Sequence, residues 1–198
     1  MGPLRIGFFY GIIAVVVALA ADLRFLFLDP REVPDWILTA IEGFRVQLAL
    51  TATLFLAILA AIRTRPTRVD PDVPYRSLLL RDCVLAATLV AAMVGFVLFV
   101  ATTLNATLFA DEIRGYAREA APSIVAYNEK VAGRLDDPPP LPTVSEVKED
   151  LQPPVPRDLG RSIANFVLRA LVAGTAGALV GVVRGRAGPS DGPKPREG

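Results

Sequence analysis

The chain has 198 residues, 53% of them hydrophobic, and its 21 lysines and arginines against 20 aspartates and glutamates leave a formal net charge of +1. It contains no histidine and one cysteine, Cys83, so it cannot build a Ser-His-Asp or Cys-His catalytic site, an imidazole metal site or an intrachain disulfide. No glycine-rich phosphate loop, zinc motif or GxSxG elbow occurs. We therefore expect no enzymatic activity, no cofactor and no metal site.

Most hydrophobic residues fall in four long blocks. A helix needs about 20 mostly apolar residues to cross a bilayer, and each block is long enough. The sequence therefore predicts an all-α integral membrane bundle of four transmembrane helices, three of them within residues 1–104. The predicted helices cover residues 6–28, 36–62, 83–104 and 161–185.

The first block, residues 6–28, has an alternative interpretation. A basic N-terminus followed by an apolar stretch that ends in small residues is also the pattern of a cleaved signal peptide, here residues 1–20. We favour a membrane helix, because the apolar pattern resumes after Arg24.

The second block begins at Trp36, after a link with two prolines that predicts a turn between antiparallel helices. Tryptophan prefers the membrane interface. Because residues 36–62 exceed the length that a bilayer requires, this helix either tilts or begins along the interface.

The loop of residues 63–82 holds five arginines, which indicates the cytoplasmic side by the positive-inside rule. We interpret its first three arginines as determinants of topology and expect no nucleic-acid partner. The basic tail, residues 186–198, is rich in glycine and proline and predicts disorder on the same side. The chain is then a multi-pass protein of the cell membrane with both termini in the cytoplasm. The three arginines are Arg63, Arg65 and Arg68.

Residues 105–160 form the predicted extracytoplasmic segment, which is partly helical and proline-rich. Apolar residues recur at helical spacing over residues 108–135, and Pro122 should either kink this helix or start a second one. After a polyproline spacer, Thr143 and Glu146 have the spacing of a capping box, which predicts a second, short helix.

The last block, residues 161–185, has an uneven distribution of residue types. Steps of four residues along it visit two arginines, an amide and three glycines on one face of the helix. Such a face is suited to close packing against protein. The partner is either this same chain or another subunit, and the sequence leaves both open. The face comprises Arg161, Asn165, Arg169, Ala173, Gly177, Gly181 and Gly185.

Five charged residues fall in or next to the predicted spans, where a charge is costly. We prefer a pairing of Arg169 with Glu42, with Asp22 as the second choice for Arg169. Structural ion pairs account for such residues more simply than a polar path for an ion. The five residues are Asp22, Arg24, Glu42, Arg45 and Arg169.

These patterns together favour a non-enzymatic accessory or scaffold subunit of a membrane complex. It would lie in the lipid bilayer and bind a membrane-protein partner, or another copy of itself, through the external segment and the small-residue face of the last helix. The alternative is a small transporter or channel subunit that uses Glu42 and Arg169.

Overall fold

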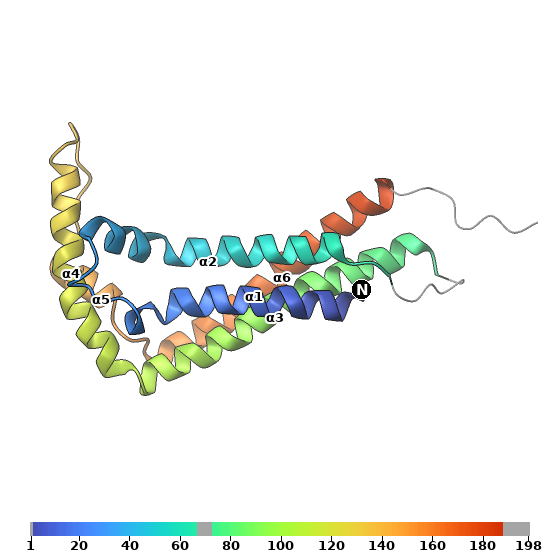
Figure 1. Ribbon diagram of the computed structural model, residues 1–198, viewed down its shortest axis with the longest axis horizontal. Coiled ribbons are helices and arrows are strands. Elements are labelled where there is room, and N and C mark those ends of the chain that lie inside the picture. The colour runs from blue at the N-terminus through green and yellow to red at the C-terminus, as the bar shows by residue number, and fades with distance from the viewer. Residues whose placement is uncertain (1, 67–72, 188–198) are drawn as a thin grey trace, which may run out of the picture. The chain divides into compact units, whose positions relative to one another are not determined.

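The computed structural model describes residues 2–66 and 73–187, and every regular element in those ranges is a helix (Figure 1). In the last helix it describes the side chains of residues 160 and 163–186. Arg68, the side chain of Arg161 and most of the predicted disordered tail lie outside the described residues. The helices are α1 (Pro3–Asp22), η1 (Arg24–Leu26), α2 (Asp35–Arg63), α3 (Tyr75–Thr107), α4 (Ala110–Ala132), α5 (Val144–Asp150) and α6 (Pro156–Ala187).

The predicted all-α class is confirmed for the described residues. Four helices, α1, α2, α3 and α6, are long and apolar enough to cross a membrane. The share of each apolar window that is buried inside the protein runs from 17% in α6 to 39% in α3. Most residues of these windows are therefore not fully buried by the chain itself.

Helix α1 ends at Asp22, six residues before the predicted end at residue 28. The chain tightens there into η1, and the Nη1 atom of Arg24 lies 3.4 Å from the carbonyl oxygen of Ala21 and 3.3 Å from that of Asp22. A basic side chain near the last carbonyls is a common way to end a helix. The apolar residues that resume after Arg24 therefore belong to a separate short helix.

Helix α3 begins at Tyr75, eight residues before the predicted start at Cys83. Its first turn follows Pro74, whose carbonyl oxygen accepts hydrogen bonds from Ser77 and Leu78. Proline at a helix start is favourable because its φ angle is already helical. Arg81 and Asp82, expected in the loop, therefore lie on the helix.

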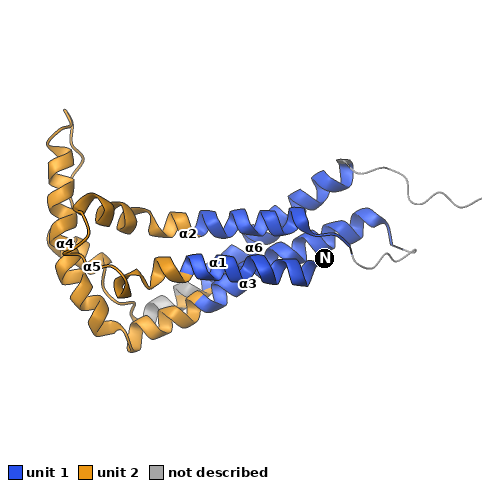
Figure 2. Cartoon of the chain, viewed as in Figure 1, with its two compact units in different colours: residues 1–18, 50–97, 164–198 blue, residues 19–49, 98–163 orange. Residues whose placement is uncertain are grey.

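The chain divides into two compact units (Figure 2). Unit 1 comprises the described residues of 1–18, 50–97 and 164–198. Its centre is a strip of small and β-branched side chains on α3, each at most 1% exposed. The strip comprises Cys83, Ala86, Ala87, Val90, Ala91 and Val94.

Glycines of α1 and α6 let these helices approach α3 in unit 1. A Cβ atom at Gly7 would lie 2.9 Å from the carbonyl oxygen of Ala86, and one at Gly177 would lie 2.8 Å from that of Cys83. Real Cβ atoms essentially never come this close. Glycine is therefore required at both positions for the observed packing.

Unit 2 comprises residues 19–49 and 98–163. Its core joins one face of α4 to Leu38 of α2 and to Val147 and Leu151 around α5. Pro122 lies inside α4 and does not start a second helix, so residues 110–132 form one helix. The proline ring is exposed, while Ala120 and Ala121 beside it are fully buried.

The predicted short helix is present as α5, and its capping box is confirmed. The Oγ1 atom of Thr143 accepts a hydrogen bond from the backbone N–H of Glu146 (3.3 Å), and the Glu146 carboxylate accepts one from the backbone N–H of Thr143 (2.7 Å). These hydrogen bonds lower the pKa of Glu146, the one from the backbone of Thr143 more than the one from its side chain.

Candidate functional site

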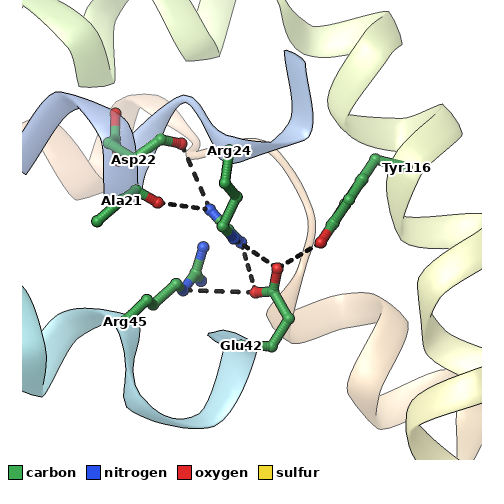
Figure 3. A network of polar contacts seen from close by, with 6 residues as sticks. All are labelled: Ala21, Asp22, Arg24, Glu42, Arg45 and Tyr116. Carbon is green, nitrogen blue, oxygen red and sulfur yellow. Dashed lines mark hydrogen bonds and ion pairs between the residues drawn. The ribbon is translucent and has the colours of Figure 1, made fainter. Parts of the chain in front are cut away.

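A buried ion pair between Arg24 and Glu42 is the centre of the charged residues in unit 2 (Figure 3). The Nε atom of Arg24 donates to Oε1 of Glu42 and its Nη2 atom donates to Oε2, each at 2.5 Å. The side chains are only 8% and 6% exposed. This two-point geometry is the strongest form of arginine–carboxylate pairing.

Two further side chains contact the same carboxylate. The hydroxyl of Tyr116 donates to Oε1 of Glu42 at 2.7 Å, and Nε of Arg45 lies 3.6 Å from Oε2. A carboxylate has about four lone-pair positions, so Glu42 is close to fully engaged. Its partners come from η1, α4 and its own helix α2 (Figure 3), so the cluster ties three elements of unit 2 together.

Tyr116 also contacts the other partner of the pair. The guanidinium carbon of Arg24 lies 5.7 Å from the centre of the Tyr116 ring, within the range of a cation–π contact. Burial raises the pKa of the Tyr116 hydroxyl, and the neighbouring Glu42 carboxylate raises it further. The hydroxyl therefore stays protonated and keeps donating to Glu42.

Asp22 lies beside this cluster, at the end of α1. Its Oδ2 atom accepts a hydrogen bond from Nδ2 of Asn105 at 2.9 Å, and Asp22 has further interactions within the chain. Asn105 is 5% exposed. The contact ties the end of α1 to the end of α3 in unit 2.

The structure gives Glu42 a partner that differs from the preferred one. Its carboxylate is bound by Arg24, because η1 turns the Arg24 side chain back toward α2. Arg169 belongs to unit 1, so its pairing with Glu42 or with Asp22 stays a prediction. Arg169 is partly buried and has interactions within the chain.

The small-residue face of α6 packs against α3 within unit 1 over most of its length. Gly177, Gly181 and Gly185 are buried, and a Cβ atom at Gly181 would lie 2.9 Å from Cα of Leu80. Ala173, 3% exposed, belongs to the same buried face. This part of the face is therefore used inside the chain.

Asn165 departs from that prediction, because it is exposed. Each step of four residues turns about 40° around a helix, so Asn165 lies about 80° away from Ala173. Phe166, the next residue, faces α3 instead, and its ring fills the space beside Gly95. The packing face therefore does not follow the four-residue steps over the whole helix.

The basic residues near the ends of α2 and α6 differ in role. Arg63 and Arg65 are exposed, as topology determinants should be, although their side of the membrane stays a prediction. Arg184 is partly buried, and its Nη1 atom donates to the carbonyl oxygens of Ala61 (2.9 Å) and Thr64 (2.8 Å). It thereby caps the C-terminal end of α2, which leaves carbonyl groups without helical partners.

Sequence reasoning missed Tyr116 and Arg184 as partners of these sites. Tyr116 lies 74 positions from Glu42, and Arg184 lies 123 positions from Ala61. Tyr116 occurs at a position that helical spacing already assigned to the core of α4. No spacing rule connects residues so far apart, and no local signal marks either contact.

Among the side chains that the structure describes, no group of three or more acidic or cysteine residues could hold a metal ion. The arrangement in unit 2 instead neutralises charge: it holds one buried carboxylate between two guanidinium groups and a phenol. Comparison of the chain with protein-family models, with curated proteins and with solved structures finds no match.

Proposed function

We propose that this chain is a multi-pass protein of the cell membrane that serves as a non-enzymatic accessory or scaffold subunit of a membrane complex. The observation that supports the proposal best is the carboxylate of Glu42, whose hydrogen-bonding positions are nearly all engaged by partners that include Arg24 and Tyr116. A carboxylate that binds a transported ion needs a free position, whereas this one stabilises the packing of α4 on α2.

The surface of the four long helices supports a membrane location. Large apolar side chains are exposed along each of them, for example Phe8 (56%), Phe55 (59%), Phe96 (65%) and Leu179 (63%). In water such a surface would drive aggregation, whereas in a bilayer it contacts lipid. The low buried share of every apolar window fits the same setting.

A partner most readily binds on unit 2, because the small-residue face of α6 is already occupied by α3. Exposed apolar side chains lie among charged residues from the end of α4 to the first residue of α5. Such mixed patches are typical of protein-binding surfaces. The apolar residues are Val131 (39% exposed), Leu135 (52%), Leu141 (40%) and Val144 (42%).

A small transporter or channel subunit is the alternative function, and the geometry supports it less. In that role Glu42→Gln should abolish transport of the solute in proteoliposomes. If Glu42 has only a structural role, the same variant should lower the stability of the protein. Any flux that the wild type shows should then be unchanged per folded molecule.

The partner is tested by purification of the tagged full-length chain in a mild detergent after brief crosslinking in cells. We expect a co-purifying membrane protein that is lost with Leu135→Glu and kept with the control Leu108→Glu, since Leu108 (69% exposed) lies before α4. A monodisperse chain that purifies alone would overturn the subunit proposal.

The orientation is tested with single cysteines in a Cys83→Ala background. An impermeant maleimide should label Asp136→Cys, which follows α4, on intact cells. It should label Val73→Cys, which precedes α3, only after the cells are opened. The reverse pattern would place both termini outside.

A further inference from the structure

An apolar groove of about 310 Å³ lies between α2 and α6 in unit 1. Leu50 and Leu54 of α2 form one wall, and Leu168 and Val172 of α6 form the other. Arg169 also lines the groove and places a positive charge in a mostly apolar wall. All of these residues belong to the apolar spans of the two helices.

The groove follows from the way the two helices are joined. At one end, Arg184 of α6 donates hydrogen bonds to the carbonyl oxygens of Ala61 in α2 and of Thr64, the residue after α2. Farther along, α6 follows α3, against which Gly177 packs closely. Leu168 (58%) and Val172 (47%) remain exposed on the side facing the groove. No side chain in the described part of unit 1 fills this space.

We propose that this groove binds an anionic phospholipid, with an acyl chain along the leucines and the phosphate on Arg169. The inference rests on the proposed membrane location and adds a ligand to it. A guanidinium group matches the geometry of phosphate oxygens. Arg169 interacts with other residues of the chain as well, and its five N–H donors can serve both.

The depth of Arg169 is compatible with a headgroup contact. It lies six residues after Ile163, the first apolar residue that follows Arg161 and Ser162 in the sequence, which corresponds to about 9 Å along the helix. A long arginine side chain can reach the headgroup region from this depth, since half of the hydrocarbon core measures about 15 Å.

Charge complementarity favours a lipid over a second copy of the chain. Symmetric docking of two copies on this groove would bring two Arg169 side chains toward each other in an apolar environment. Among the described residues of unit 1 the only carboxylate is Asp82, which is 3% exposed and paired with Arg81. Docked in this symmetric way, a second copy would bring another guanidinium group to Arg169, whereas a phospholipid brings an anion.

The test measures bound lipid by native mass spectrometry on the full-length chain, purified from membranes and mixed with phosphatidylglycerol or phosphatidylcholine in detergent. We expect one phosphatidylglycerol per chain, retained about tenfold more than phosphatidylcholine, a ratio that corresponds to about 1.4 kcal/mol. Arg169→Gln should remove this preference. Arg186→Gln, an exposed arginine near the end of the same helix, is the matched control.

A second pair of variants tests the apolar part of the groove. Val172→Trp should fill the space and lower the retention of both lipids about tenfold, whereas Val183→Trp, 65% exposed on the same helix and outside the groove, should not. Each variant is compared at equal folded fraction, measured by thermal unfolding.

Three results would overturn the proposal. The first is equal retention of the two lipids by the wild type. The second is equal retention of phosphatidylglycerol by Val172→Trp and Val183→Trp. The third is a wild-type dimer without bound lipid that dissociates in Val172→Trp and not in Val183→Trp. Failure to find a protein partner would contradict the accessory-subunit proposal but leave this lipid measurement unaffected. Absence of the chain from the membrane fraction would contradict both.

Discussion

Arg24 and Glu42 come from different elements and meet through two hydrogen bonds in the interior of unit 2, with nearly all of both side chains covered. In Glu42→Gln a neutral amide would face the buried guanidinium. Loss of one member of a buried pair costs about 3–5 kcal/mol. We expect a reduction of this size in the free energy of unfolding, measured in detergent by tryptophan fluorescence.

The matched control for this variant is Glu119→Gln, because Glu119 forms an ion pair with Arg31 that is largely exposed. Exposed pairs contribute about 0–1 kcal/mol. If the two variants lowered the free energy of unfolding equally, the cluster around Glu42 would not have the role assigned to it.

Tyr116 predicts a dependence of stability on alkaline pH. Burial, and then the charge of Glu42, raise the pKa of Tyr116 above its ordinary value of 10.0. In the unfolded chain the tyrosine ionises near pH 10, while in the folded chain it stays protonated. The contribution of the protonated Tyr116 hydroxyl to the free energy of unfolding is therefore fully present below about pH 10 and is lost as the pH rises above it.

Tyr116→Phe should remove this part of the alkaline decline. It should also lower the free energy of unfolding at pH 7 by about 1.5–3 kcal/mol, because a hydrogen bond to a charged group is lost. Unfolding curves from pH 7 to 11 test both effects. Tyr127→Phe, on the same helix, should keep the pH dependence of the wild type, and parallel curves for the two variants would contradict the prediction.

The approach of α6 to α3 should not tolerate even one methyl group. Gly181→Ala places a Cβ atom 2.9 Å from Cα of Leu80 and should lower the free energy of unfolding by about 1–3 kcal/mol. Gly115→Ala is the control, since nothing lies within 4 Å of a Cβ there. It should stabilise α4 by about 0.5–1 kcal/mol.

Gel filtration separates this packing within the chain from packing between subunits. We expect the elution volume of Gly181→Ala to match that of the wild type while its unfolding shifts. If Gly181→Ala eluted as a smaller particle than the wild type and its free energy of unfolding were unchanged, the small-residue face of α6 would instead pack against another subunit.

Arg184 should hold the end of α2 and also shield Cys83. Its Nη1 atom lies 3.8 Å from Sγ of Cys83, which itself donates to the carbonyl oxygen of Ala61 at 3.3 Å. Arg184→Ala removes hydrogen bonds from a charged donor, so we expect a loss of about 1.5–3 kcal/mol. Maleimide labelling of Cys83 should become faster.

The exposed Arg186 provides the control for this change. Arg186→Ala should leave both the unfolding and the labelling rate of Cys83 as they are in the wild type. Fast labelling of the wild-type cysteine would show that the buried contact with Arg184 is not maintained in solution.

The presence of four long apolar helices, the capping box at Thr143 and the tight packing of Gly177 and Gly181 were predictable, because each depends on composition or spacing within one segment. The end of α1 was not, because the apolar pattern continues after Arg24. That helix ends where Arg24 turns back onto the carbonyl groups of Ala21 and Asp22, and the Arg24 side chain is also bound by Glu42, 18 positions along the chain.

The amino-acid sequence by itself determined an all-helical chain with four apolar segments of membrane-spanning length, because helix formation and hydrophobicity are properties of neighbouring residues. Only the tertiary structure decided which charges meet. A buried charge is stabilised by an opposite charge that reaches it with good hydrogen-bond geometry. Which opposite charge can do so depends on where each helix ends and where the chain turns. Glu42 is therefore paired with Arg24 and Tyr116, and the glycines of α6 have their partner within the same chain.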